Sequence, residues 1–240
     1  MKNFIIAAVG SASFIASADA GVLGYSAFAY TASNGNVVID VFTVVSNASD
    51  RLLNVYNVNL TTTQGGSTLA TFVQQAGTAT RGWKPDATTS TRSNIVDSFM
   101  TIGVDGGAAY EGQYYASAGT GADGSFTNWS SLAPTVPVNA GWFLSPPTLP
   151  DNVAESMVGI VGVRTDSSAA AAGSNLGVWC AHFVIASGDV GARWWNATAA
   201  SKDGITGGTV TNTGTMNMVP APGALALLGV AGFASRRRRA

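Results

Sequence analysis

The segment from residue 21 to residue 217 consists of short apolar stretches separated by clusters of Gly, Asn, Ser, Asp and Pro. A chain that meets a turn-forming cluster about every ten residues has room for strands but not for long helices. One helical turn is expected, at Ala169–Ala172, which Gly173 would end. Nine strands are expected, at Leu23–Tyr30, Val37–Ser46, Leu52–Thr62, Leu69–Gln74, Asn94–Val104, Gln113–Ala118, Met157–Arg164, Leu176–Ala186 and Thr209–Thr215.

The composition supports an all-β fold. Charged residues make up only 10% of the chain and there are 29 glycines, whereas helices rely on Glu, Lys, Gln and Arg. Without helices to cross between parallel strands, we expect a single antiparallel β-sandwich, with a jelly-roll-like topology as one form of it. Cys180 is the single cysteine, so an intrachain disulfide is excluded.

Two segments are expected to form long loops, residues 81–93 and residues 119–152. The second contains five prolines, which interrupt the hydrogen-bonded ladder of a sheet; they are Pro134, Pro137, Pro146, Pro147 and Pro150. Because long loops in a compact domain are often functional, we expect a binding surface on these two.

The first 20 residues have the layout of a signal peptide. Lys2 precedes an apolar stretch from Phe4 to Ala16, and the small residues Ala18 and Ala20 occupy the −3 and −1 positions that signal peptidase reads. We therefore expect export, with cleavage after Ala20 and a mature chain that begins at Gly21. The alternative is that this stretch forms a buried first strand.

The C-terminal residues 218–240 have three parts. A Pro-containing motif comes first, then an apolar stretch at 224–234, and then four consecutive arginines. The stretch is shorter than the roughly 20 residues of a stable transmembrane helix, and arginines directly after it would stay on the cytoplasmic side. The motif is Val219, Pro220, Ala221, Pro222 and Gly223, and the arginines are Arg236, Arg237, Arg238 and Arg239.

This tail resembles the sorting signals of the PEP-CTERM family, also catalogued as the C-terminal domain of ice-binding-type proteins. The resemblance implies a transient membrane anchor, processing by an exosortase-like enzyme, and delivery to the bacterial cell surface or extracellular matrix. Ala221 replaces the acid of the Pro-Glu-Pro motif. The signal peptide and the tail together divide the chain into three parts: signal peptide 1–20, extracellular β domain 21–217 and sorting tail 218–240. An ordinary short anchor with a basic stop is the alternative.

The charges exclude one class of partner. Residues 21–219 contain 7 basic and 12 acidic side chains, which gives a net charge of −5. A mildly acidic domain lacks the positive surface that nucleic acids require, so a nucleic-acid partner is not expected.

Few residues suggest catalysis. Cys180 and His182 are two positions apart on one expected strand, which would place them on the same face, but no activating signature surrounds them. The acids are scattered singly, so nothing selects the carboxylate pair of a glycosidase. Calcium could use the Asp-Gly turns at 105, 123 and 203, although Asp-Gly is primarily a turn pair. We expect no enzyme activity, no resident metal and no cofactor.

The leading hypothesis is therefore a non-catalytic surface or matrix protein. Its six tryptophans suggest a polysaccharide ligand, because an exposed indole ring can stack on a sugar. The tryptophans in or beside the expected loops are Trp83, Trp129 and Trp142, and these are the expected binding residues. The alternative is a secreted hydrolase that acts on glycans through an unidentified carboxylate pair.

Overall fold

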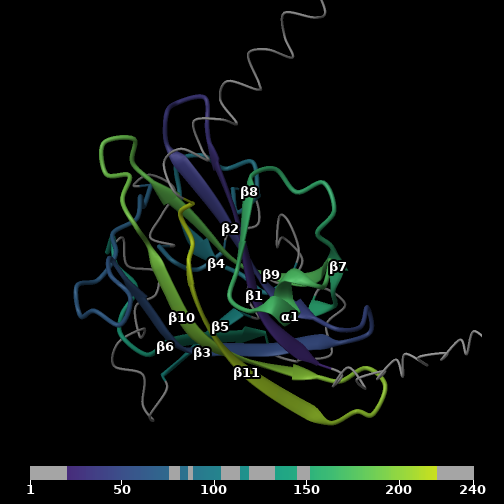
Figure 1. Ribbon diagram of the computed structural model, residues 1–240. Coiled ribbons are helices and arrows are strands. Elements are labelled where there is room, and N and C mark those ends of the chain that lie inside the picture. The colour runs from purple at the N-terminus through teal and green to yellow at the C-terminus, as the bar shows by residue number, and fades with distance from the viewer. Residues whose placement is uncertain are drawn as a thin grey trace, which may run out of the picture.

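The computed structural model describes residues 21–75, 82–85, 89–103, 114–118, 133–144 and 152–220. They form an antiparallel β-sandwich, as the sequence predicts, in which two sheets pack face to face (Figure 1). Within these residues no helix is both long and apolar enough to cross a membrane. The signal-peptide residues Ala18 and Ala20, and the tail from Ala221 onward, lie outside the described residues.

The first sheet, sheet A, has the strand order β4-β9-β2-β1-β8, and β7 pairs with β9 beside β4. The second, sheet B, has the order β11-β10-β3-β6-β5, and every pair in both sheets is antiparallel. Sheet A contains β1 (Val22–Thr31), β2 (Val37–Val45), β4 (Phe99–Met100), β7 (Glu155–Ser156), β8 (Val163–Asp166) and β9 (Leu176–Ile185). Sheet B contains β3 (Arg51–Thr61), β5 (Tyr114–Ala118), β6 (Ala140–Leu144), β10 (Trp194–Lys202) and β11 (Thr209–Asn217).

The main core lies between the sheets and follows from strand periodicity. Alternate residues of β2 (Val37, Ile39 and Val41) and of β10 (Trp195 and Ala197) all belong to it. Burial of each of the larger aliphatic side chains contributes about 1.5–3 kcal/mol.

Sheet A is also covered on its outer face, by the chain around Met157 and by a short helix. The helix, α1 (Ala169–Ala172), begins at Ser168, whose hydroxyl accepts from the Ala171 N–H at 3.1 Å, and it ends at Gly173 as predicted. A second apolar cluster fills the space beneath them: Phe28, Phe42, Val44, Phe99, Met157, Ala171 and Trp179. Both faces of β2 are therefore buried, and so is every one of its 9 residues.

Three expected strands are shorter than predicted. Leu69–Gln74 contributes only isolated bridges at Leu69 and Thr71, and Asn94–Val104 contributes only β4. Of Met157–Arg164, only Val163 and Arg164 are in a strand, which is β8.

Three strands were not predicted, β6, β7 and β10. In the expected loop 119–152, the prolines lie before and after Ala140–Leu144, so β6 itself keeps all its N–H groups. Alanine-rich β10 has weak strand propensity, but pairing with β3 on one side and β11 on the other stabilises it.

Candidate functional site

Two of the three tryptophans expected to bind sugar lie in the core. Trp83 is 1% exposed and its indole N–H donates to the Ala133 carbonyl at 3.0 Å. Trp142 is fully buried and donates to the carbonyl oxygen of Thr101 at 3.0 Å. Neither ring offers a face to a sugar, so the prediction that they form an exposed platform is wrong. Trp129 lies outside the described residues.

Trp194 is the one tryptophan among the described residues that is partly exposed. It begins β10, and its neighbour Trp195 is fully buried in the core. Since adjacent side chains of a strand point to opposite faces, the Trp194 ring lies on the outer face of sheet B. The sequence contained a signal for this ring. Trp194 and Trp195 are consecutive, so in a strand one of the two indoles has to lie on the outer face of the sheet.

A groove of about 390 Å³ lies beside Trp194 on this outer face. Asn59 of β3 and Thr215 of β11 are both register partners of Asn196 in β10, so the three side chains lie in one row across the sheet. Leu69 lines the groove as well. We call this the Trp194 groove. None of the described residues that line it is ionisable: Asn59, Thr61, Gly65, Gly66, Ser67, Leu69, Val138, Trp194, Asn196 and Thr215.

Hydrogen bonds fix the polar side chains of the Trp194 groove. The Asn196 amide donates to the Thr215 hydroxyl at 3.0 Å. The Asn59 amide donates to the Asn139 side-chain oxygen at 3.1 Å and accepts from the Asn139 backbone N–H at 3.2 Å. The described residues of the groove therefore present an indole ring beside oriented amide and hydroxyl groups.

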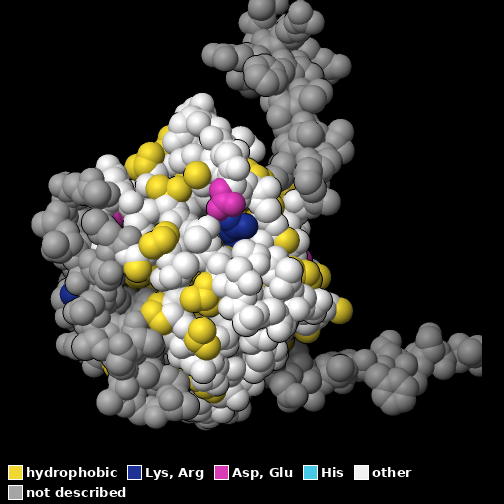
Figure 2. Space-filling view, turned by 90° about the vertical axis from the view of Figure 1, so that its left-hand side faces the viewer, with side chains coloured by type: hydrophobic (Ala, Val, Ile, Leu, Met, Phe, Trp, Pro, Cys, Tyr) yellow, Lys and Arg dark blue, Asp and Glu magenta, His cyan; other side chains and the backbone are white. Residues whose placement is uncertain are grey.

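The sparse charge extends beyond the groove. Figure 2 shows scattered hydrophobic side chains and few charged ones on the described part of the face turned to the viewer. Of the described cations, Arg193 pairs with Asp189 at 2.7 Å and Arg164 with Asp166 at 2.8 Å. A surface of this kind suits a neutral ligand better than a strongly charged one.

The structure separates Cys180 from His182, contrary to the prediction that they share a face. The register of β9 against β2 shifts at Cys180. Ala181 pairs with Val41, whereas Trp179 pairs with Phe42, so Cys180 has no partner of its own on β2. This β-bulge reverses the alternation. The Cys180 thiol lies in the core between the sheets, and His182 stacks on Phe99 on the outer face of sheet A, with ring centroids 4.8 Å apart.

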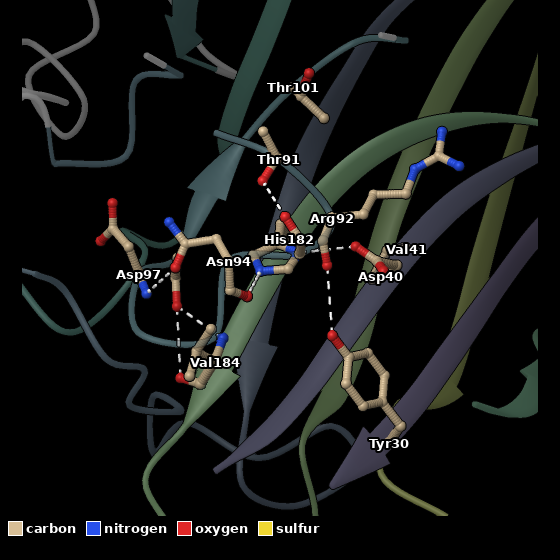
Figure 3. A network of polar contacts seen from close by, with 12 residues as sticks. Tyr30, Asp40, Val41, Thr91, Arg92, Asn94, Asp97, Thr101, His182 and Val184 are labelled. Atoms are coloured by element: carbon tan, nitrogen blue, oxygen red, sulfur yellow. Dashed lines mark hydrogen bonds and ion pairs between the residues drawn. The ribbon is translucent and has the colours of Figure 1, made fainter. Parts of the chain in front are cut away.

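Both ring nitrogens of His182 are already used (Figure 3). Nδ1 lies 2.8 Å from the Asp40 carboxylate, and Nε2 lies 2.8 Å from the Asn94 carbonyl oxygen. A carbonyl oxygen only accepts, so Nε2 carries a hydrogen. The imidazole is buried and has no free nitrogen to act as a base, so it links sheet A to the segment that covers it.

That covering segment, residues 89–99, is held by Arg92 as well as by Asn94. The guanidinium lies 5.0 Å from the Trp179 ring centroid and 5.3 Å from that of Phe42, and it forms an ion pair with Glu155. These contacts place the Arg92 guanidinium over two aromatic rings of sheet A. We call residues 89–99 the covering segment.

The described acids each have a structural partner. Glu155, Asp166, Asp189 and Asp40 pair with cationic side chains or His182, and Asp97 accepts from the Gln75 N–H at 2.9 Å. Asp50 and Asp203 accept hydrogen bonds from backbone N–H groups and hydroxyls. No carboxylate pair of a hydrolase is therefore present among the acids that the structure describes.

Asp203, one of the three calcium candidates, acts as a turn residue. Its carboxylate accepts from the Thr206 hydroxyl at 2.6 Å and from the Ile205 N–H at 2.7 Å. These hydrogen bonds, that of the Thr206 hydroxyl first, lower the pKa of Asp203. Among the described residues, no group of three His, Cys, Asp or Glu side chains could hold a metal ion. Asp105 and Asp123 lie outside those residues.

The expected sorting motif is only partly described. Val219 is 5% exposed and packs in the main core, as does Met218, which is fully buried. Pro220 is the last described residue and is buried as well. The β domain thus includes three residues that the sequence assigned to the tail. Arg236, Arg237, Arg238 and Arg239 lie outside the described residues.

No known protein family, curated protein or solved structure matches this chain.

Proposed function

We propose that this chain is an exported, non-catalytic component of the cell surface or extracellular matrix, and that it binds a neutral polysaccharide in the Trp194 groove. The observation that carries the binding proposal is the position of Trp194. It is partly exposed in a groove whose other polar groups are amides and hydroxyls.

Sugar chemistry fits this arrangement. A pyranose ring has an apolar face of C–H groups and a rim of hydroxyls, so it needs an aromatic surface and neutral hydrogen-bonding groups together. Trp194 and Leu69 supply apolar surface, and Asn59 and Asn196 supply amides. The described part of the lining contains no ionisable residue, which favours neutral sugars over uronic acids or sulfated chains.

Export and sorting rest on the two ends of the chain. Signal peptidase would cleave after Ala20, and an exosortase-like enzyme would act near the Pro-Ala-Pro motif after the tail has held the protein transiently in the membrane. An intact-mass spectrum of the protein from its native cell surface and medium tests both steps. We expect a species that begins at Gly21. A species that retains Arg236–Arg239 would overturn the transient anchor.

The binding proposal is tested by replacing Trp194. We expect Trp194→Ala to weaken binding to a neutral polysaccharide at least tenfold, since one good aromatic contact contributes about 1.5 kcal/mol or more. Thr209→Ala is the matched control, because Thr209 is exposed on the same sheet at the opposite end of β11. Pull-down on a panel of insoluble neutral and acidic polysaccharides measures both.

Two results would contradict the proposal. One is unchanged binding in Trp194→Ala, which would exclude the groove as the site. The other is binding to acidic polysaccharides alone, with affinity that falls steeply as salt rises, which would indicate an electrostatic surface elsewhere.

A further inference from the structure

The first residue of the expected mature chain is fixed in the fold. The Gly21 backbone N–H donates to the Ser46 hydroxyl at 2.8 Å, and the Ser46 N–H donates to the Gly21 carbonyl oxygen at 3.1 Å. Gly21 is also buried. A chain end of this kind usually frays unless specific contacts hold it, and here two reciprocal hydrogen bonds do so.

Only glycine fits at this position. Gly21 has φ of +126°, and a Cβ placed on it would lie 2.6 Å from the Cβ of Val210 at the start of β11. Val210 therefore packs directly against the Cα of Gly21, which leaves no room for a side chain there. The two hydrogen bonds with Ser46 hold the backbone nitrogen beside that hydroxyl.

Behind Ser46 lies a buried carboxylate with neutral partners. Asp50 is fully buried, and its oxygens accept from the Ser46 hydroxyl at 3.2 Å, the Asn47 N–H at 3.0 Å and the Gly204 N–H at 3.0 Å. Among the described residues, no ion pair joins Asp50 to a cation. Buried carboxylates are usually paired with a positive charge, because leaving water is costly for an unpaired one.

We propose that the missing cation is the N-terminal ammonium group of Gly21, which export creates. This inference rests on the cleavage after Ala20 proposed above. Signal peptidase hydrolyses the Ala20–Gly21 amide with one water molecule. Ala20 keeps the new carboxylate, and the Gly21 amine takes up a proton. The ammonium then donates to the Ser46 hydroxyl, which donates to the Asp50 carboxylate.

The pairing of Gly21 with Asp50 makes the stability of the fold depend on removal of the signal peptide. In the precursor the Gly21 nitrogen is a neutral amide with one hydrogen, so Asp50 has no countercharge there. In the mature chain the same nitrogen carries a positive charge and three hydrogens at an unchanged position. The fold is therefore more stable after the signal peptide has been removed than before.

Chains that differ only at the N-terminus test this directly. All end at Ala240 and are kept in one detergent solution: one begins at Gly21 with a free amine, one has the Gly21 amine acetylated, and one begins at Ala20. We expect the unfolding equilibrium constant from urea titration to rise about tenfold on acetylation, because a charged hydrogen bond is replaced by a neutral one. The chain that begins at Ala20 should resemble the acetylated one.

The variant Asp50→Asn assigns the effect to the carboxylate. In Asp50→Asn the free and acetylated chains should have nearly equal unfolding constants. Equal constants in the unmodified sequence would overturn this inference and leave the export proposal intact. An undiminished difference in Asp50→Asn would overturn it too, because the amine would then act on another group. A native protein that begins at a residue other than Gly21 would contradict both proposals.

Discussion

The Cys180 thiol lies in the core between the two sheets, and burial raises its pKa from 9.0 to about 12. The thiol donates to the Val41 carbonyl oxygen at 3.3 Å. In the unfolded chain the same thiol ionises near pH 9. The thiol therefore gives its full contribution to stability below pH 9 and loses it as the pH rises toward about 12.

The prediction at this scale concerns alkaline stability. Between pH 8 and pH 10.5 the thiol should lower the free energy of unfolding by about 2 kcal/mol, since the unfolded state ionises and the folded state does not. Urea titrations at both pH values measure the change. Cys180→Ala is the control, because it removes this titration and keeps that of Tyr25, whose pKa burial also raises. The same pH dependence in both proteins would contradict the prediction.

Single residues also show where sequence reasoning ends. Alternation on β9 predicts the correct face for Phe183 and Ile185, which pack in the main core. It fails between Cys180 and His182 because a bulge depends on how β9 pairs with β2, and no local residue specifies it. Likewise, Trp83 is buried because Phe72 and Phe183 pack against its ring, at centroid distances of 6.0 and 6.3 Å.

At the scale of elements, sheet A depends on the covering segment 89–99, which packs over His182 and Trp179. His182→Ala should lower the free energy of unfolding by about 3–5 kcal/mol, because it leaves the buried Asp40 carboxylate without its partner. Asp40→Asn should lower the free energy of unfolding by less, since the asparagine amide can still hydrogen-bond to the His182 ring. Ser93→Ala, in the same segment but exposed, is the control and should change stability by less than about 0.5 kcal/mol.

Hydrogen exchange distinguishes loss of the segment from a general loss of stability. The Met100 N–H donates to the Trp83 carbonyl at 2.9 Å, and the Thr101 N–H donates to the Cys180 carbonyl at 3.1 Å. In His182→Ala we expect these amides to exchange before those in the centre of β2. Equal loss of protection at both places would mean that the covering segment unfolds only with the whole domain.

The strands that the sequence predicted well are those whose own residues have high strand propensity and are flanked by turns. The β-branched stretch Val37–Val45 and the aromatic-rich stretch Leu176–Ile185 have high strand propensity and clear turns on either side. By contrast, β10 is formed by alanines whose strand state depends on two neighbours distant in sequence. The Trp194 groove is lined by three strands and the turn at Gly65–Gly66, so its lining follows from sheet order, which the sequence alone did not contain.

At the scale of the whole molecule, the first and last residues of the described β domain lie far apart, near opposite ends of β11. Gly21 lies against Val210 near the start of β11, whereas Met218 follows the end of that strand and donates to the Arg193 carbonyl at 2.8 Å. Nine residues of extended strand span about 30 Å. The N-terminal cleavage and the C-terminal sorting step would therefore act at opposite ends of one rigid domain.

This arrangement limits where the tail can be removed from a folded domain. Met218 and Val219 pack in the main core, so a chain that begins at Gly21 and ends at Pro220 should be as stable as one that ends at Ala240. A chain that ends at Asn217 should lose about 3–5 kcal/mol of unfolding free energy, from the burial of these two side chains. Urea titration of the three chains measures the difference. Equal stability of the chains that end at 217 and 220 would show that these residues do not hold the domain together, and a processing enzyme could then cut before Met218 without cost. The expected loss instead confines processing of the folded protein to Pro220 or beyond.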